Sequence, residues 1–213
     1  MNVAQVSGIL AVLYPTPLAQ EEALTALAEI RAAAERSTRY SRFSALAGFL
    51  SGAAALAGSG VCGWFDDFIG AQPKLGLQFV GLWGAVLLFA ATAQIWMTVL
   101  KARQRGEAIF TPIARTATAS LLGPGIAGVA GSGIFIATEQ WTLLPGLWLL
   151  LYGCGLWSVS FFAPMFLRVL GAGFIVLGLV AWWQPQLAAL WLGLGFGGLH
   201  FVFSAVVLAR YRS

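Results

Sequence analysis

Residues 187–209 read "LAALWLGLGFGGLHFVFSAVVLA" and hold no charged side chain. An α-helix of about 20 apolar residues is long enough to cross the hydrocarbon core of a membrane. The stretch therefore predicts a transmembrane helix. The only histidine of the sequence, His200, lies within it and is expected near the middle of the membrane.

Five more apolar runs of similar length precede this one. They cover residues 44–65, 75–100, 113–137, 141–162 and 165–183. Only 9% of the 213 residues are charged, whereas a soluble domain has about a quarter. The sequence thus predicts an all-α fold, a polytopic membrane helix bundle with six transmembrane helices in residues 44–213.

Basic residues predict the orientation of this bundle. Eleven of the twelve precede the first run, separate the second from the third, open the fifth or follow the sixth, and only Lys74 falls on the other side. Because cytoplasmic loops are enriched in Lys and Arg, both termini are predicted to be cytoplasmic. Tryptophans at the opposite ends of the runs are expected to form an interfacial belt. These are Trp64, Trp141, Trp182, Trp183 and Trp191.

The segment before the first run predicts a cytoplasmic amphipathic helix over residues 17–43, after a flexible lead at residues 1–16. Its glutamates come early and its arginines late, as the helix dipole favours. Leu24, Leu27 and Ile30 form a thin apolar stripe. Such a helix lies on the membrane surface or binds a protein partner. A solvated helix without a partner is the alternative.

The net charge of +4 could suggest an acidic partner. The basic residues are, however, dispersed in short segments between apolar runs, so no nucleic-acid partner is predicted. Membrane lipids and a protein on the cytoplasmic side are the expected partners, and a homo-oligomer is left open. The basic junction that would meet them consists of Arg36, Arg39, Arg42 and Arg168.

The first run carries small residues at every fourth position, flanked by a GxxxG pair. Such a stripe lets helix backbones approach closely in a membrane. It predicts a helix-packing face, either within one chain or between protomers. Its members are Ala47, Gly48, Ser51, Gly52, Ala55 and Ser59.

Four residues in the runs are candidates for ligand contact or for packing. Pro124, flanked by glycines, removes a backbone donor and predicts a kink or break in the third run. His200 is an intramembrane ionisable residue, which is a functional candidate by default. Gln94 and Tyr152 are among its potential hydrogen-bond partners. We expect His200 to be a neutral, hydrogen-bonded packing residue.

Catalytic chemistry is not indicated. Enzymes of the membrane gather carboxylates, a nucleophile with its base, or metal ligands. Here Asp66 and Asp67, in a predicted outer loop, are the only adjacent acidic pair outside the N-terminal helix. A haem would need a second axial ligand besides His200. The sequence therefore predicts a protein that is not an enzyme and has no cofactor or metal.

Several stretches resemble a family of bacterial multi-pass membrane proteins to which no activity is assigned. The opening "EIRAAAERSTRYSRFSALAGFLSGAAALAGS" (29–59) is similar to its ERS[ST]RF segment and first span, and "LWLGLGFGGLHFVFS" (190–204) carries its GFGxLH motif. "FTPIAR" (110–115) and "LRVLG" (167–171) extend the likeness over nearly the whole chain. The loop before Arg168 departs from the family, because it lacks the Lys and acidic residues found there. The resemblance implies six spans in a bacterial inner membrane, and it singles out the arginine-rich junction and His200.

Two functions compete at this point. The first is a non-enzymatic accessory, sensor or scaffold protein that acts through partners with its N-terminal helix. The alternative is a channel or transporter for a small or apolar solute, lined by the broken third helix and His200. A polar, water-filled tunnel would favour transport, and a closed bundle packed through small residues would favour partners.

Overall fold

The computed structural model of the chain describes residues 21–29, 45–64, 73–106, 112–161 and 165–211. The chain divides into two compact units, Met1–Tyr40 and Ser41–Ser213. Each unit is described by itself below.

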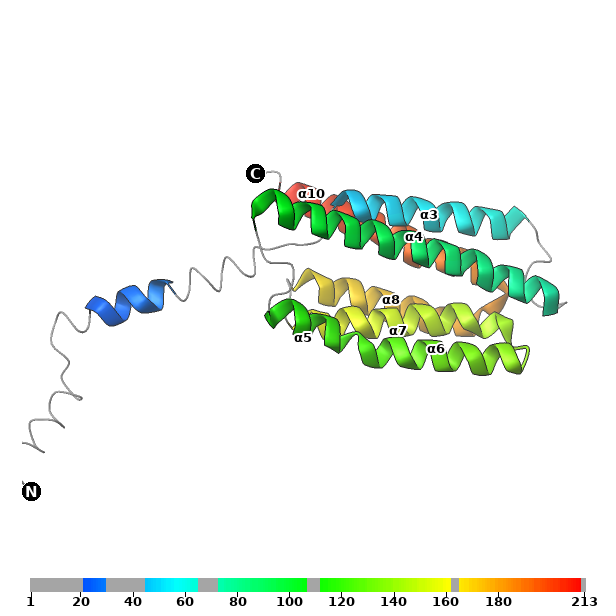
Figure 1. The fold of residues 1–213 in the computed structure, drawn as a ribbon. Coiled ribbons are helices and arrows are strands. Elements are labelled where there is room, and N and C mark those ends of the chain that lie inside the picture. Colours follow the sequence, from blue (N-terminus) through cyan, green and yellow to red (C-terminus); the bar gives the residue numbers. More distant parts are fainter. Residues whose placement is uncertain (1–20, 30–44, 65–72, 107–111, 162–164, 212–213) are drawn as a thin grey trace, which may run out of the picture. The chain divides into compact units, whose positions relative to one another are not determined.

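In the first unit, residues 21–29 form a helix with exposed side chains, drawn in blue in Figure 1. The hydroxyl of Thr25 donates to the backbone carbonyl of Glu21, one turn earlier, at 2.8 Å. Leu24 and Leu27 leave their side chains exposed. The rest of the predicted helix and the predicted lead lie outside the described residues, as do Ile30, Arg36, Arg39 and Arg42.

The second unit confirms the predicted fold class. It contains six helices that are long and apolar enough to cross a membrane, so the chain is a multi-pass transmembrane protein. The first two are α3 (Ala45–Trp64) and α4 (Pro73–Arg105). The third is divided into α5 (Pro112–Ser120) and α6 (Leu122–Ala137). The fourth is η1 (Trp141–Leu143) with α7 (Leu144–Val159), and the fifth is α8 (Phe166–Trp183). The sixth comprises η2 (Pro185–Leu187), α9 (Ala188–Leu192), η3 (Gly193–Leu199) and α10 (His200–Tyr211).

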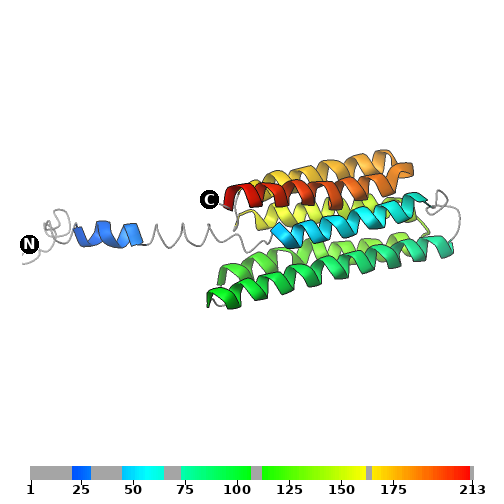
Figure 2. The same cartoon turned by 90° about the horizontal axis from the view of Figure 1, so that it is seen from above.

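These helices lie lengthwise in two layers (Figure 1). One layer holds α3, α4 and α10, and the other holds α5 with α6, α7 and α8. Figure 2 shows the same helices from above, with successive spans running in opposite directions. Because the number of spans is even, the start of α3 and the end of α10 lie at the same end of the bundle.

Helix α4 is longer than a membrane is thick. Its 33 residues extend about 50 Å at 1.5 Å per residue, against a hydrocarbon core of about 30 Å. Its first half is anchored in the core by Phe79 and Trp83, which are buried. Farther along the helix Leu87, Leu88 and Ile95 are exposed, which suits contact with lipid.

The third span is interrupted as the sequence predicts. The break falls at Leu121, whose amide bonds three residues back to Thr118 before α6 begins. Pro124 is the third residue of α6, where a missing backbone donor costs no helical hydrogen bond. None of the 24 residues from Ala114 to Ala137 is buried. The third span is therefore peripheral and packs mainly on α7.

The small-residue stripe of α3 makes its contact within the chain. Its partner is the sixth span, because a side chain at Gly52 would meet the ring of Phe201 and one at Gly48 would meet Ser204. Ala47 and Ala55 are buried in the same face. The hydroxyl of Ser59 donates to the carbonyl of Ala189 at 2.6 Å, whereas that of Ser51 bonds within its own helix. The stripe thus joins the first span to the last.

A second glycine contact, between α7 and α8, is closer still. A Cβ atom at Gly153 would lie 2.7 Å from the carbonyl oxygen of Gly171. One at Gly178 would lie 2.9 Å from that of Gly146. The two helices therefore touch backbone to backbone. This helix pair was not predicted from the sequence, although the glycines recur seven residues apart in both helices.

The prediction of an interfacial tryptophan belt at the outer ends of the spans is wrong for Trp141. This side chain is only 5% exposed because its ring packs over Gly76 of α4, whereas Trp183 is 86% exposed. The Nε1 of Trp182 donates to the carbonyl of Leu143 at 2.9 Å. Trp64 lies outside the residues whose side chains are described. Tryptophan near a span end can thus fill a glycine gap between helices instead of meeting the membrane interface.

Candidate functional site

Four aromatic rings meet where the two layers of the bundle touch. We call Tyr152, Phe174, Phe196 and His200 the aromatic–histidine cluster. They come from α7, α8, η3 and α10, and all six ring pairs lie within 6.4 Å between centroids. Within this cluster the side chain of Phe174 is fully buried. The cluster therefore fastens the fourth, fifth and sixth spans together.

The hydrogen bond expected of His200 is present. The phenol oxygen of Tyr152 and the Nε2 atom of His200 lie 3.0 Å apart. The phenol is both donor and acceptor, and the neutral imidazole has one nitrogen of each kind. The pair can therefore bond with Tyr152 as donor and Nε2 as acceptor. No carboxylate lies in residues 140–213 to stabilise an imidazolium, so the arrangement favours a neutral histidine.

The other ring nitrogen of His200 faces an irregular stretch of backbone. Nδ1 is buried near the carbonyls of Gly195 and Phe196 but forms no hydrogen bond of good geometry. These carbonyls belong to η3, a π-helix that precedes His200 directly. Four of its seven residues are glycine, and side chains at Gly193, Gly195 and Gly197 would collide with neighbouring helices. The missing side chains at these glycines let the sixth span approach α3 and α7.

The other candidates from the sequence do not join this cluster. Pro124 lies on the periphery, where it faces Gly155 of α7. Gln94 is half-buried in α4, where its backbone carbonyl accepts a hydrogen bond from Thr98. The rings that contact His200 in the described part of the chain come from α7, α8 and η3. The structure thus brings Tyr152 and His200 together and leaves Pro124 and Gln94 elsewhere.

Arg168, the described member of the basic junction, lies in the first turn of α8. Its Nε donates to the hydroxyl of Ser160 at 3.3 Å. Its guanidinium carbon lies 4.9 Å from the ring centroid of Phe161 and 5.8 Å from that of Trp157. The charge is held against aromatic faces at the end of α7, which is the geometry of a cation–π contact.

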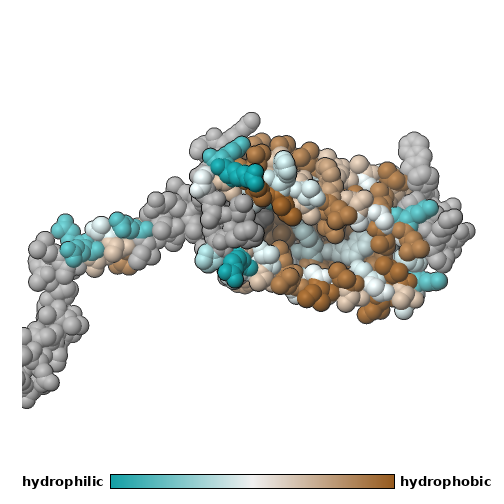
Figure 3. Space-filling model, in the orientation of Figure 1, coloured by the Kyte–Doolittle hydropathy of each residue, from teal (hydrophilic) through white to brown (hydrophobic). Residues whose placement is uncertain are grey.

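The surface between the layers is hollowed. Figure 3 shows this hollow between α4 and the divided third span, with apolar side chains on both rims and a paler floor. Hydrophilic side chains gather at the ends of the bundle in the same view. Within the described ranges, no three His, Cys, Asp or Glu side chains come together as metal ligands would.

No family model, no curated protein and no solved structure matches the chain. The family resemblance drawn from the sequence stays a prediction, and what is shown is the six-helix apolar bundle.

Proposed function

We propose that the chain is a non-enzymatic protein of the bacterial inner membrane that acts through partner proteins, as an accessory, sensor or scaffold protein. The observation that carries the proposal is the helix at residues 21–29. Leu24 and Leu27 expose one apolar face, and Glu22 and Glu29 lie on the opposite face. An exposed amphipathic helix gains stability when its apolar face is covered.

The charge of this helix favours a protein over a lipid surface as the partner. Residues 21–29 contain three glutamates and no basic residue. Helices that bind anionic membranes carry Lys and Arg on their polar face, and glutamates there would be repelled. A groove in a partner protein that receives the two leucines is the better fit.

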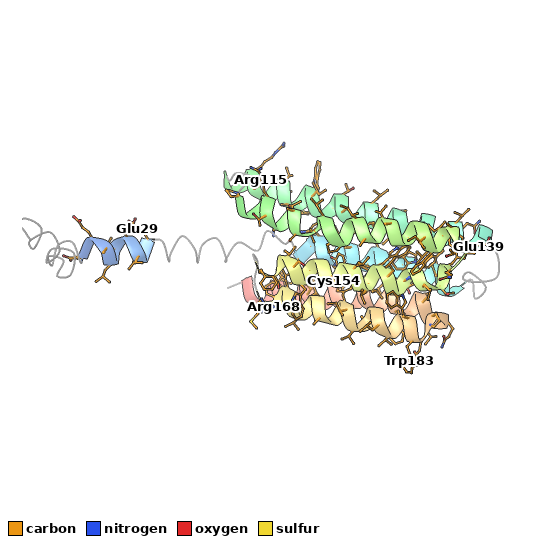
Figure 4. The ribbon with its side chains drawn as sticks, turned by 90° about the horizontal axis from the view of Figure 1, so that it is seen from below. Glu29, Arg115, Glu139, Cys154, Arg168 and Trp183 are labelled. Atoms are coloured by element: carbon orange, nitrogen blue, oxygen red, sulfur yellow. The ribbon has the colours of Figure 1, made fainter. Side chains whose placement is uncertain are left out.

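The orientation in this proposal places both termini in the cytoplasm. Arg115 and Arg168 lie at one end of the bundle and Glu139 and Trp183 at the other (Figure 4). The basic end of α4 is at the same end as Arg115 (Figure 1). Cytoplasmic ends of membrane proteins are rich in Lys and Arg, which supports this orientation. The likeness to the ERS[ST]RF and GFGxLH family supports a bacterial source.

Photo-crosslinking in intact cells tests the partner. A photoreactive phenylalanine derivative replaces Leu24 or Leu27 in turn, and Glu29 serves as the matched control on the opposite face. We expect a crosslinked product of one defined mass from both leucine positions and a much weaker one from Glu29. The absence of a product, or equal yields at all three positions, would reject the partner role of this helix.

Transport of a small or apolar solute is the second candidate. The hollow between α4 and the divided third span favours it (Figure 3), as does the incomplete burial of Tyr152 and His200. Against it, the backbone contacts of α7 with α8 and of α3 with the sixth span close the bundle. Solute flux into proteoliposomes that is lost in Tyr152→Phe would favour transport over the partner role.

A further inference from the structure

The contacts of Arg168 in the described part of the chain are one hydroxyl and two aromatic rings. The sequence has no Asp or Glu after Glu139, which lies at the opposite end of the bundle. Among the residues that the structure describes, no carboxylate lies within ion-pair distance of Arg168. Charged side chains in transmembrane segments almost always pair with another charged or polar group. The contacts of Arg168 with Ser160, Trp157 and Phe161 position the guanidinium but do not neutralise it.

The local helix adds to the positive potential. Arg168 is the third residue of α8, and the first turn of this helix has no acidic residue and no side-chain cap. The beginning of a helix carries partial positive charge, so an arginine there is the opposite of the usual preference. Two positive features at one place favour a bound anion.

The surroundings of Arg168 are apolar and face outward. Phe161, Met165 and Val169 are each about two-thirds exposed or more. They lie at the point where the fifth span begins, which is where phospholipid headgroups meet acyl chains. Ser160 is buried, and its hydroxyl accepts the hydrogen bond from the Nε atom of Arg168. The two Nη groups of the planar guanidinium are then suited to donate to two phosphate oxygens.

We infer that Arg168 binds the phosphate of an anionic phospholipid, whose acyl chain lies along the exposed apolar side chains at the start of α8. Ser160 and Phe161 are positioning residues for the guanidinium. This site is independent of the proposed protein partner, because it lies in the membrane domain and uses none of residues 21–29.

Native mass spectrometry of the full chain in a neutral detergent tests the site, since such a micelle has no surface potential of its own. The protein is titrated with phosphatidylglycerol, with zwitterionic phosphatidylcholine and with inorganic phosphate. We expect phosphatidylglycerol to bind most tightly. Arg168→Gln should weaken its binding roughly tenfold, the effect of losing one charge-assisted contact. Phosphate at the same concentration should not displace it.

Arg115→Gln is the matched control, because Arg115 is an exposed arginine near the start of α5 at the same end of the bundle. It should leave phosphatidylglycerol binding unchanged. Phe161→Leu removes the ring beneath the guanidinium from an exposed position, and should weaken binding even if Arg168→Gln does not fold. Equal losses in Arg115→Gln and in the variants at the site would overturn the inference. So would displacement of the lipid by phosphate alone.

Discussion

Gly178→Ala should strongly destabilise the bundle, because the added methyl group meets backbone atoms of the neighbouring helix. The new Cβ atom would lie 2.7 Å from the backbone nitrogen of Leu150 and 2.9 Å from the carbonyl oxygen of Gly146. Backbone atoms cannot rotate away as side chains do, so α7 and α8 must separate. We expect the free energy of unfolding to fall by about 3 kcal/mol, at the upper end of overpacking effects. Unfolding in mixed micelles, followed by circular dichroism, measures this change.

Gly133→Ala is the control for this substitution. Gly133 also lies in a membrane helix, α6, but a Cβ atom there would have open space around it. Alanine is the better helix former by up to about 1 kcal/mol, so this variant should be as stable as the parent or slightly more stable. If both variants unfold alike, the close contact between α7 and α8 does not hold the bundle together.

The hydrogen bond in the aromatic–histidine cluster should show strong coupling between its two residues. Tyr152→Phe and His200→Leu each leave one polar group inside the bundle unpaired, away from water. We expect each change to cost roughly 1–3 kcal/mol of unfolding free energy. In the double variant both polar groups are gone, so its loss should be close to that of one single variant rather than to the sum.

The same unfolding measurement on the parent, the two single variants and the double variant gives the coupling energy. His200→Asn should be milder than His200→Leu, because an amide can still bond with the Tyr152 hydroxyl. Additive losses in the double variant would contradict the hydrogen bond of 3.0 Å between these residues as a source of stability.

Hydropathy alone predicted the six spans, because a helix in lipid needs a continuous apolar run whatever it touches. The missing donor of Pro124 predicted a kink or break in the third span, and the structure places the break three residues earlier, at Leu121. Local patterns of this kind do not depend on which helices are neighbours. They therefore gave the boundaries of α3 and α8 to within one residue or so.

What could not be predicted depends on contacts between distant residues. Tyr152 and His200 are 48 residues apart, and nothing in either run names the other as its partner. The stripe of α3 predicted a packing face but left its partner open. The position of Trp141 near a span end predicted an interfacial side chain, whereas its ring packs over Gly76 of another helix. The π-helix at Gly193–Leu199 contains four glycines, but no local pattern in this stretch distinguishes it from an α-helix.

The orientation of the bundle decides which compartment the N-terminal helix meets, and cysteine labelling measures it directly. Single cysteines at Glu139 or Arg103 are introduced after both native cysteines, which are free thiols, have been replaced. In intact cells an impermeant maleimide should modify Glu139→Cys at once, and should modify Arg103→Cys only after permeabilisation. The reverse pattern would place the basic end and the N-terminal helix outside the cell, and would contradict the proposed cytoplasmic partner.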